Sequence, residues 1–566
     1  MGFEDLEMLV IAVVLVIVAV SYFAGKLGVA APILLVVIGI GLSLIPGLPP
    51  IAPEPELILT VVLPPLLYSA AVNMPVVDFR RDFGTIGALS VVLVLVSAFG
   101  IGLLLWWIFP DLHLAAAIAV GAIVSPPDAV AATAIGKKLG LPPRLLTVLE
   151  GEGLVNDATA LVLLRTAVAA TAGTFSFWHA VGDFAYAVVI AIAAGVVIGA
   201  VSVWIRSSIQ QPALSTAISF AVPFLAFLPA EALNASGVIA VVVAGLITGA
   251  GSARKHSVQD RSSERTNWLT VQMLLENGVF LLMGLQLMTL VGDVEDVGLS
   301  VWIAVWVGLL VTVALGVVRV GFVVPLMFGI RRRQRRSREK VELFGDMLER
   351  VADDERWQQH PRGPRIQRHL RRQHADARFY ANEGIGWRGG AVIAWSGMRG
   401  VVTLAAAQSL PTDFPYRTQL MLIAFVVAIV TLVGQGGTLP LLIRVLGIRG
   451  TDEEHAKREL RLLLTELNEA AAKQVIDNPD LRRRDGTRFD DGVLERARKM
   501  REQFTDPDRA EARDSTMQQV RELEALILEA EQDALGEARS TGAFSSHTIE
   551  RAQRRIDSGA MRLEHD

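Results

Sequence analysis

Long apolar segments alternate with short polar or Pro/Gly-rich breaks along most of this chain. An apolar segment of about 20 residues is long enough to cross a lipid bilayer as a helix. The least distinct division lies within 213–250, a stretch that could also hold one kinked span and a re-entrant piece. The pattern predicts thirteen membrane-spanning helices, at 6–26, 29–48, 54–73, 84–109, 113–136, 143–172, 178–205, 213–231, 234–250, 268–291, 299–330, 388–410 and 417–447.

The composition places the chain among all-α polytopic membrane proteins. Hydrophobic residues make up 52% of the 566 residues and charged residues 19%. The mean hydropathy of +0.45 is too apolar for a soluble protein of this size. Because the chain has no cysteine, disulfides, thiol catalysis and cysteine-bound metals are excluded. Basic clusters flank the spans, so the expected surroundings are a lipid bilayer, and nothing indicates a nucleic acid partner.

Lys and Arg fall in every second loop between the predicted spans. The positive-inside rule then places the N-terminus outside the cell membrane and the C-terminus in the cytoplasm, which agrees with an odd number of crossings. The densest cluster, 331–340, has seven basic residues in ten. We interpret it as a strong positive-inside signal, with a contact to anionic lipid as the alternative.

The composition changes sharply after residue 447, and this change divides the chain into two domains. Residues 1–447 form the predicted transmembrane domain, which includes a basic, partly helical cytoplasmic loop at 331–387. Residues 448–566 consist of charged amphipathic stretches that begin near a capping-box spacing at Thr451–Glu454. We expect a cytoplasmic helical tail that serves as a folded or dimerising module.

Two carboxylates, Glu152 and Asp157, lie in the predicted span 143–172. An ionisable group at the bilayer centre costs at least about 2.5–3.5 kcal/mol, so it usually faces a partner or a water-filled cavity. Five residues correspond to about 140° around a helix, so the two side chains point in different directions. One can bind a cationic partner while the other lines a cavity, beside the neutral amide of Asn156.

Two other spans carry helix-breaking residues next to a charge. Ser125-Pro-Pro-Asp128 lacks two backbone N–H donors at mid-membrane depth, which favours a broken helix lining a cavity over a simple kink. Transporters with inverted repeats place such helices at matching positions in both halves. The matching span contains Ser396-Gly-Met-Arg-Gly400, where Arg399 needs an acid of the span 143–172 as its partner. Glu276 and Arg319 are further intramembrane charges that we interpret as anchors between helices.

Four motifs in this order resemble those of the sodium/proton antiporters of cation:proton antiporter family one (NhaP/NHE type). The resemblance covers roughly residues 6–447 and is specific because the motifs occur together. It implies the thirteen-span fold, a moving core domain with crossed broken helices, and a homodimer. The motifs are Leu63-Pro-Pro-Leu-Leu67, Pro127-Asp-Ala-Val-Ala131, Glu152-Gly-Leu-Val-Asn-Asp157 and Gly397-Met-Arg-Gly-Val401.

The resemblance also implies roles for individual residues. Asp157 resembles the essential aspartate that binds the monovalent cation or the proton, Asp128 resembles the aspartate of the unwound span, and Asn156 resembles the asparagine of the electroneutral branch. Ser125 and Pro127 complete this ion-binding set. Glu152 and Arg399 resemble a buried structural ion pair. No cofactor and no metal other than the transported cation are implied.

Three positions depart from the family pattern and bear on which cation is preferred. Ser69 stands where some relatives have a ligating glutamate, so it is at most an accessory hydroxyl. Pro127 replaces a common threonine and leaves only backbone carbonyls. Gly153 replaces a common ligand serine.

The predicted function is secondary active exchange of a monovalent cation, Na⁺ before Li⁺ or K⁺, for H⁺ by electroneutral alternating access, and not enzymatic catalysis. A K⁺/H⁺ antiporter of the same fold is one alternative. An intramembrane aspartyl protease that uses Asp128 and Asp157 as a dyad is another, although the sequence lacks a Gly-x-Gly-Asp element. A cation channel is a third, without a visible filter sequence.

Overall fold

The computed structural model describes residues 3–27, 29–45, 55–171, 177–209, 211–255, 258–353, 363–382 and 384–448. Every regular element within these ranges is a helix, which confirms the predicted fold class. The predicted tail, apart from residue 448, lies outside the described residues, and so does its capping box.

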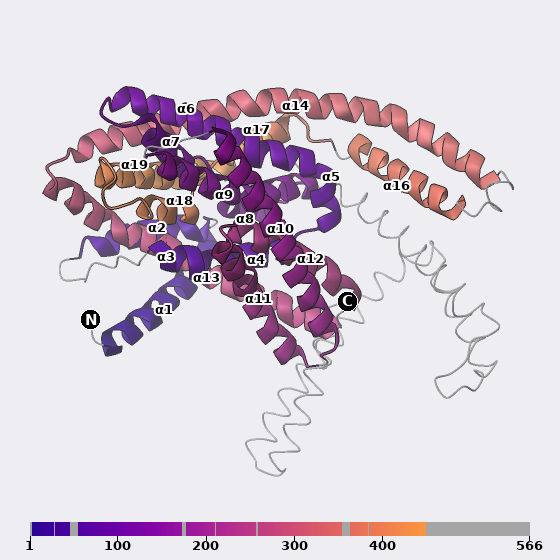
Figure 1. The fold of residues 1–566 in the computed structure, drawn as a ribbon, viewed down its shortest axis with the longest axis horizontal. Coiled ribbons are helices and arrows are strands. Elements are labelled where there is room, and N and C mark those ends of the chain that lie inside the picture. The colour runs from indigo at the N-terminus through magenta and orange to yellow at the C-terminus, as the bar shows by residue number, and fades with distance from the viewer. Residues whose placement is uncertain are drawn as a thin grey trace, which may run out of the picture. The chain divides into compact units, whose positions relative to one another are not determined.

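The helices follow the predicted apolar segments closely (Figure 1). Three of them contain a π-helical turn: η1 (Ile58–Val62), η2 (Ala88–Val92) and η3 (Thr431–Gln435). The α-helices are α1 (Phe3–Leu27), α2 (Ala31–Ser43), α3 (Pro55–Leu57), α4 (Leu63–Val72), α5 (Val76–Gly87), α6 (Leu93–Ile108), α7 (Leu114–Val124), α8 (Ala129–Lys138), α9 (Pro143–Thr171), α10 (Phe177–Ser207), α11 (Pro212–Ala232), α12 (Gly237–Lys255), α13 (Val258–Asp296), α14 (Val301–Asp353), α16 (Gly363–Asn382), α17 (Trp387–Trp395), α18 (Val401–Gln408), α19 (Arg417–Val430) and α20 (Gly436–Leu446).

Among the described residues, nine helices are long and apolar enough to cross a membrane, and three shorter apolar helices accompany them. The stretch 213–250 forms two separate helices, α11 and α12, as the thirteen-span division requires. The predicted span 388–410 is interrupted, because α17 ends at Trp395 and α18 begins at Val401. The count of thirteen crossings itself stays a prediction.

Two hydrophobic cores hold the helices together, and α9 contributes to both. Leu149 and Leu164 of α9 belong to the larger core, with side chains of α2, α6, α7, α13, α14 and α19. Leu154 and Ala158 belong to the smaller core, with side chains of α4, α11 and α12. Because Asp157 lies between these positions, the helix that carries the predicted ion-binding residue stands at the junction of the two cores.

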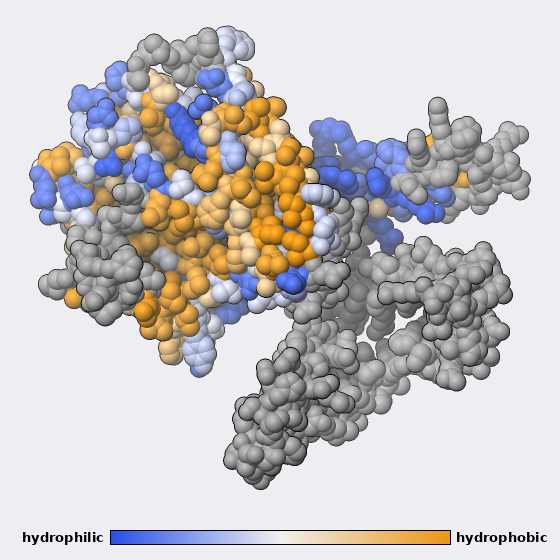
Figure 2. Space-filling view, turned by 60° about the horizontal axis from the view of Figure 1, so that its bottom comes forward, coloured by the Kyte–Doolittle hydropathy of each residue, from blue (hydrophilic) through white to orange (hydrophobic). Residues whose placement is uncertain are grey.

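Small residues let some helices approach at backbone distance, as is common where helices pack inside a membrane. Gly39 of α2 and Gly284 of α13 face each other so closely that a Cβ added at either position would overlap the opposite backbone. Large apolar side chains remain exposed on the outside, among them Trp302, Val313 and Phe328 of α14 at 73%, 64% and 66% exposure. Figure 2 shows broad hydrophobic areas on the visible face of this helical body, as contact with lipid requires.

The basic cluster at 331–340 continues α14 as one uninterrupted helix, and α16 packs against this extension (Figure 1). The predicted loop at 331–387 is therefore largely a pair of helices in its described part. Asp376 of α16 accepts from Arg81 Nε at 2.7 Å, and the Tyr380 hydroxyl donates to the Arg81 carbonyl. Burial raises the pKa of Tyr380, which keeps this hydroxyl protonated as a donor.

A buried ion pair fixes the start of α9 to α5. Arg144 donates through Nε and one terminal nitrogen to the two carboxylate oxygens of Asp82, at 2.8 and 2.7 Å. The side chains are 5% and 0% exposed. Removing one partner of a buried pair leaves an uncompensated charge, which is costly.

We predict that Asp82→Ala lowers the free energy of unfolding by about 3–5 kcal/mol, because Arg144 loses this carboxylate while buried. Asp78→Ala is the matched control on the same helix. Its contact with Arg81 is 3.6 Å long and partly exposed, so its loss should cost less than about 1 kcal/mol. Unfolding titrations of the detergent-solubilised protein measure both, and equal losses would contradict this assignment.

Candidate ion-binding site

The span that contains Pro126 and Pro127 is broken as predicted. The helix α7 ends at Val124, and α8 begins at Ala129, because neither proline can donate a backbone hydrogen bond. Asp128 is the N-cap of α8, and its Oδ1 accepts from the backbone N–H of Val130 at 2.8 Å. A carboxylate at this position also offsets the positive end of the helix dipole.

The second break, at residues 396–400 between α17 and α18, meets the first one directly. The backbone N–H of Asp128 donates to the Met398 carbonyl at 2.6 Å. The Asp128 carboxylate lies against the Gly400 Cα so closely that a Cβ at residue 400 would overlap it. The two discontinuous helices that the sequence predicts separately therefore hydrogen-bond to each other.

Arg399 binds main-chain carbonyls that the two breaks leave without helical partners. Its Nε donates to the Val124 carbonyl at 2.8 Å, and its terminal nitrogens donate to the carbonyls of Gly397 and, at 3.4 Å, Ser125. The side chain is buried, with the residue 3% exposed. The guanidinium thus supplies positive charge at the negative, C-terminal end of α7.

The buried ion pair of α9 has a different cation from the one expected. Both carboxylate oxygens of Glu152 accept from the terminal nitrogens of Arg319, at 2.6 and 2.8 Å, and Arg319 Nε donates to the Ile393 carbonyl at 2.9 Å. The expected pairing of Glu152 with Arg399 is corrected accordingly. Its physical reason is that broken helices expose carbonyl oxygens, which satisfy Arg399 without a carboxylate. Arg319 is the anchor between helices that we inferred, joining α9, α14 and α17.

The other side of α9 faces the first break. The amide nitrogen of Asn156 donates to the Pro127 carbonyl at 2.6 Å. Its amide oxygen is buried and accepts no hydrogen bond from the described residues. Asp157 follows directly and lies within Coulombic range of Asp128, and both aspartates keep partial exposure. Glu152 and Asp157 thus lie in different surroundings, as their spacing predicts.

Two predicted site residues use their hydroxyl hydrogens elsewhere. The Ser125 hydroxyl donates to the Ala122 carbonyl at 3.0 Å, so this residue contributes to the site through its backbone. The Ser69 hydroxyl lies within hydrogen-bonding distance of the Gln272 side-chain oxygen, at 3.0 Å, and of the Trp268 carbonyl, at 3.3 Å. Gly153 packs against Ala129, whose Cβ would lie 2.9 Å from a Cβ at residue 153.

A third acid, Glu276 of α13, lies closer to the site than its interpretation as an anchor indicated. It is 8% exposed and lies close enough to Asp128 for the two carboxylates to interact. One of its carboxylate oxygens has no hydrogen-bond partner in the described part of the chain. No motif surrounds Glu276, and the only sequence signal was an isolated charge inside an apolar span.

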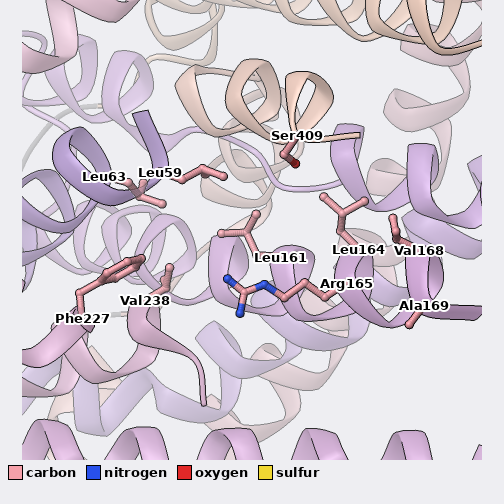
Figure 3. A pocket seen from close by; sticks show the side chains of 10 residues that line it. All are labelled: Leu59, Leu63, Leu161, Leu164, Arg165, Val168, Ala169, Phe227, Val238 and Ser409. Carbon is pink, nitrogen blue, oxygen red and sulfur yellow. The ribbon is translucent and has the colours of Figure 1, made fainter. Parts of the chain in front are cut away.

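A cavity of about 400 Å³ lies farther along α9 (Figure 3). Leucine side chains form much of its wall, and Arg165 points into it (Figure 3). Arg165 also pairs with Glu231 of α11 at 2.9 Å. Eight residues of helix separate Arg165 from Asp157, a rise of about 12 Å.

We predict that the coupling energy between Glu152 and Arg319 is about 1–3 kcal/mol, because the two side chains bind each other inside the protein. A double-mutant cycle with Glu152→Gln and Arg319→Gln, read out as free energy of unfolding in detergent, measures it. The matched cycle with Glu152→Gln and Arg399→Gln should give a smaller value. A larger coupling energy between Glu152 and Arg399 would instead support the pairing that the sequence predicts.

The chain is similar to known proteins along most of its length. The family model described as "Sodium/hydrogen exchanger, transmembrane" matches residues 11–445. The chain is 29% identical over 472 residues to an uncharacterised Na⁺/H⁺ exchanger of Mycobacterium tuberculosis, over 82% of this chain and 78% of that protein. It is 28% identical over 421 residues to the Na⁺/H⁺ antiporter ApNhaP of Aphanothece halophytica, over 74% of this chain and 70% of that protein.

A solved structure shows the same fold. The sodium proton antiporter MjNhaP1 from Methanocaldococcus jannaschii matches with a TM-score of 0.56 and 15% identity, over 79% of this chain and 100% of that one. The family match includes both broken helices and the whole of α9. The chain therefore belongs to the sodium/hydrogen exchanger family, a family of membrane antiporters and not of enzymes.

Proposed function

We propose that this protein exchanges a monovalent cation, Na⁺ in the first place, for H⁺ across the cell membrane. The observation that carries the proposal is that Asp157 lies close to Asp128, and Asn156 binds the Pro127 carbonyl, where two broken helices meet. Buried polar main chain in a membrane is tolerated where it lines a cavity. An ion pathway provides such a cavity.

Competition for one carboxylate is sufficient for exchange. A carboxylate binds a cation only when it is deprotonated, so cation binding releases a proton and proton binding releases the cation. Asp157 is the proposed exchanging group, with Asp128 close to it and the neighbouring Asn156 bound through its amide nitrogen to the Pro127 carbonyl. Glu152 is already bound by Arg319, so its charge is compensated and takes no part in the exchange.

The stoichiometry follows from the charges that remain. Asn156 places a neutral amide next to Asp157, where a second acid would add a charge. If Asp157 alone alternates between one cation and one proton, each cycle moves no net charge, and transport is electroneutral. K⁺ in place of Na⁺ is the alternative within the same mechanism. The aspartyl protease is not favoured, because the chain belongs to a family of antiporters.

The proposed conformational change moves α9 relative to the smaller core. The cavity of about 400 Å³ lies between α9 and helices of that core, and the pair of Arg165 with Glu231 bridges α9 and α11 there. The positive-inside pattern supports an outside N-terminus and a cytoplasmic C-terminus, which makes this cavity the outer entrance. The resemblance to family one supports a homodimer.

Proteoliposomes with a trapped pH-sensitive dye test the proposal. We predict that added Na⁺ changes the internal pH in vesicles with wild-type protein and that Asp157→Asn abolishes the response, because the exchanging carboxylate is lost. Asp293→Asn, which removes an exposed acid at the end of α13, is the matched control and should transport normally. Parallel additions of Li⁺ and K⁺ rank the cations. No change of internal pH with any of the three cations, in vesicles that contain folded and inserted protein, would refute the proposal.

We further predict that Gly400→Ala lowers the exchange rate by about tenfold or more, because the new Cβ displaces the Asp128 carboxylate and small displacements in a site are costly. Gly437→Ala is the matched control, since a Cβ there meets nothing within 4 Å. Initial rates in the dye assay measure both. Normal transport by a folded Gly400→Ala variant would show that the contact with Asp128 is unimportant.

A further inference from the structure

A second cavity, of about 460 Å³, lies between α14 and α16, along the basic part of α14 that follows the predicted span 299–330. Four basic side chains of α14 line one wall, and Gln373 and Asp376 of α16 lie on the other. Figure 2 shows this pair of helices as a hydrophilic extension of the apolar body. The basic residues are Arg332, Arg333, Arg336 and Lys340.

The basic residues converge on the cavity because of their spacing. Arg332, Arg336 and Lys340 are four residues apart, so they lie above one another on one face of α14. Arg331, Arg335 and Arg338 belong to the same basic cluster but do not line the cavity. The cluster therefore has two sides, of which one faces α16.

The cavity has an excess of positive charge. Among the described residues that line the cavity, Asp376 is the acid. Its carboxylate already accepts a hydrogen bond from Arg81 at 2.7 Å. Like charges held together repel, and an anion with several oxygens offsets them best. Arginine binds phosphate through its planar fork of N–H donors, and the Gln373 amide can add another donor.

Contacts between α14 and α16 hold one part of the cavity wall, at Arg333, in place before any ligand binds. Arg333 lies over the Tyr380 ring at 4.2 Å, and the Tyr380 hydroxyl donates to the Arg81 carbonyl. Gln334 donates to the Ala381 carbonyl at 3.1 Å. A site that is already formed needs less ordering when its ligand arrives, which favours binding.

We propose that this cavity binds a phosphate-bearing anion. Gly329, at the end of the predicted span 299–330, lines the cavity, so the cavity begins where a bilayer's headgroups begin. The phosphate could belong to an anionic lipid headgroup of the cytoplasmic leaflet or to a soluble polyphosphate, since both present the same chemistry to the arginines. The site lies apart from the ion-binding aspartates and does not depend on the exchange mechanism.

Binding to the full-length protein in detergent tests the proposal with two probes, tripolyphosphate and dioctanoyl phosphatidylglycerol, by microscale thermophoresis. The test variant is Arg332→Gln/Arg336→Gln/Lys340→Gln, which leaves the Arg333–Tyr380 contact intact. The control is Arg331→Gln/Arg335→Gln/Arg338→Gln, which removes the same charge from the other side of α14. We expect the test variant to weaken binding of at least one probe about tenfold or more and the control to weaken it less than about twofold.

Saturable binding of the lipid alone identifies a headgroup site, and saturable binding of tripolyphosphate alone identifies a site for a soluble anion. Each result supports the proposal if the test variant weakens the binding and the control does not. Equal weakening by both variants would show a diffuse basic surface and overturn the proposal. Absence of saturable binding of both probes to folded wild-type protein would overturn it as well. Melting temperatures check the folding of each variant. If a triple variant is unfolded, the single variant Arg336→Gln is compared with the single control Arg335→Gln instead.

Discussion

The structure depends on how two broken helices satisfy their own ends inside a membrane. Arg399 binds carbonyls at the end of α7, and the backbone of Asp128 bonds to Met398 across the two breaks. Without these contacts the exposed main chain would cost several kcal/mol per group in hydrocarbon. The same contacts bring Asp128 to the face of α9 that carries Asn156 and Asp157. The contacts that satisfy the exposed main chain of the two breaks are therefore also the contacts that assemble the proposed ion-binding site.

The buried charges divide into two groups with different tasks. The pair of Glu152 with Arg319 and the pair of Asp82 with Arg144 are saturated by their partners and fasten α9 at two points. Asp128, Asp157 and Glu276 form the second group, in which Asp157 and Glu276 each lie close to Asp128. Carboxylates that lie close together attract a cation between them. We propose that exchange takes place in this second group, at Asp157.

Periodicity and motifs predicted most of this, and the failures have physical causes. Apolar runs place the helices, and the prolines at 126 and 127 place the first break, because both signals are local along the chain. The partner of Glu152 could not be deduced, since the choice between Arg319 and Arg399 depends on which carbonyls the breaks expose in three dimensions. Glu276 gave no signal beyond its charge, because its proximity to Asp128 arises from packing between α13 and distant segments.

Competition between a cation and a proton for Asp157 is the central proposal. Proton release into weakly buffered detergent solution on addition of Na⁺ tests it without a membrane. We expect release of about one proton per protein chain from wild-type protein, at a pH where the site is protonated, and none from Asp157→Asn. Saturable Na⁺ binding to wild-type protein without proton release would contradict the proposal. The measurement covers about pH 5 to 9, a range that includes the pKa values of many carboxyl groups in proteins.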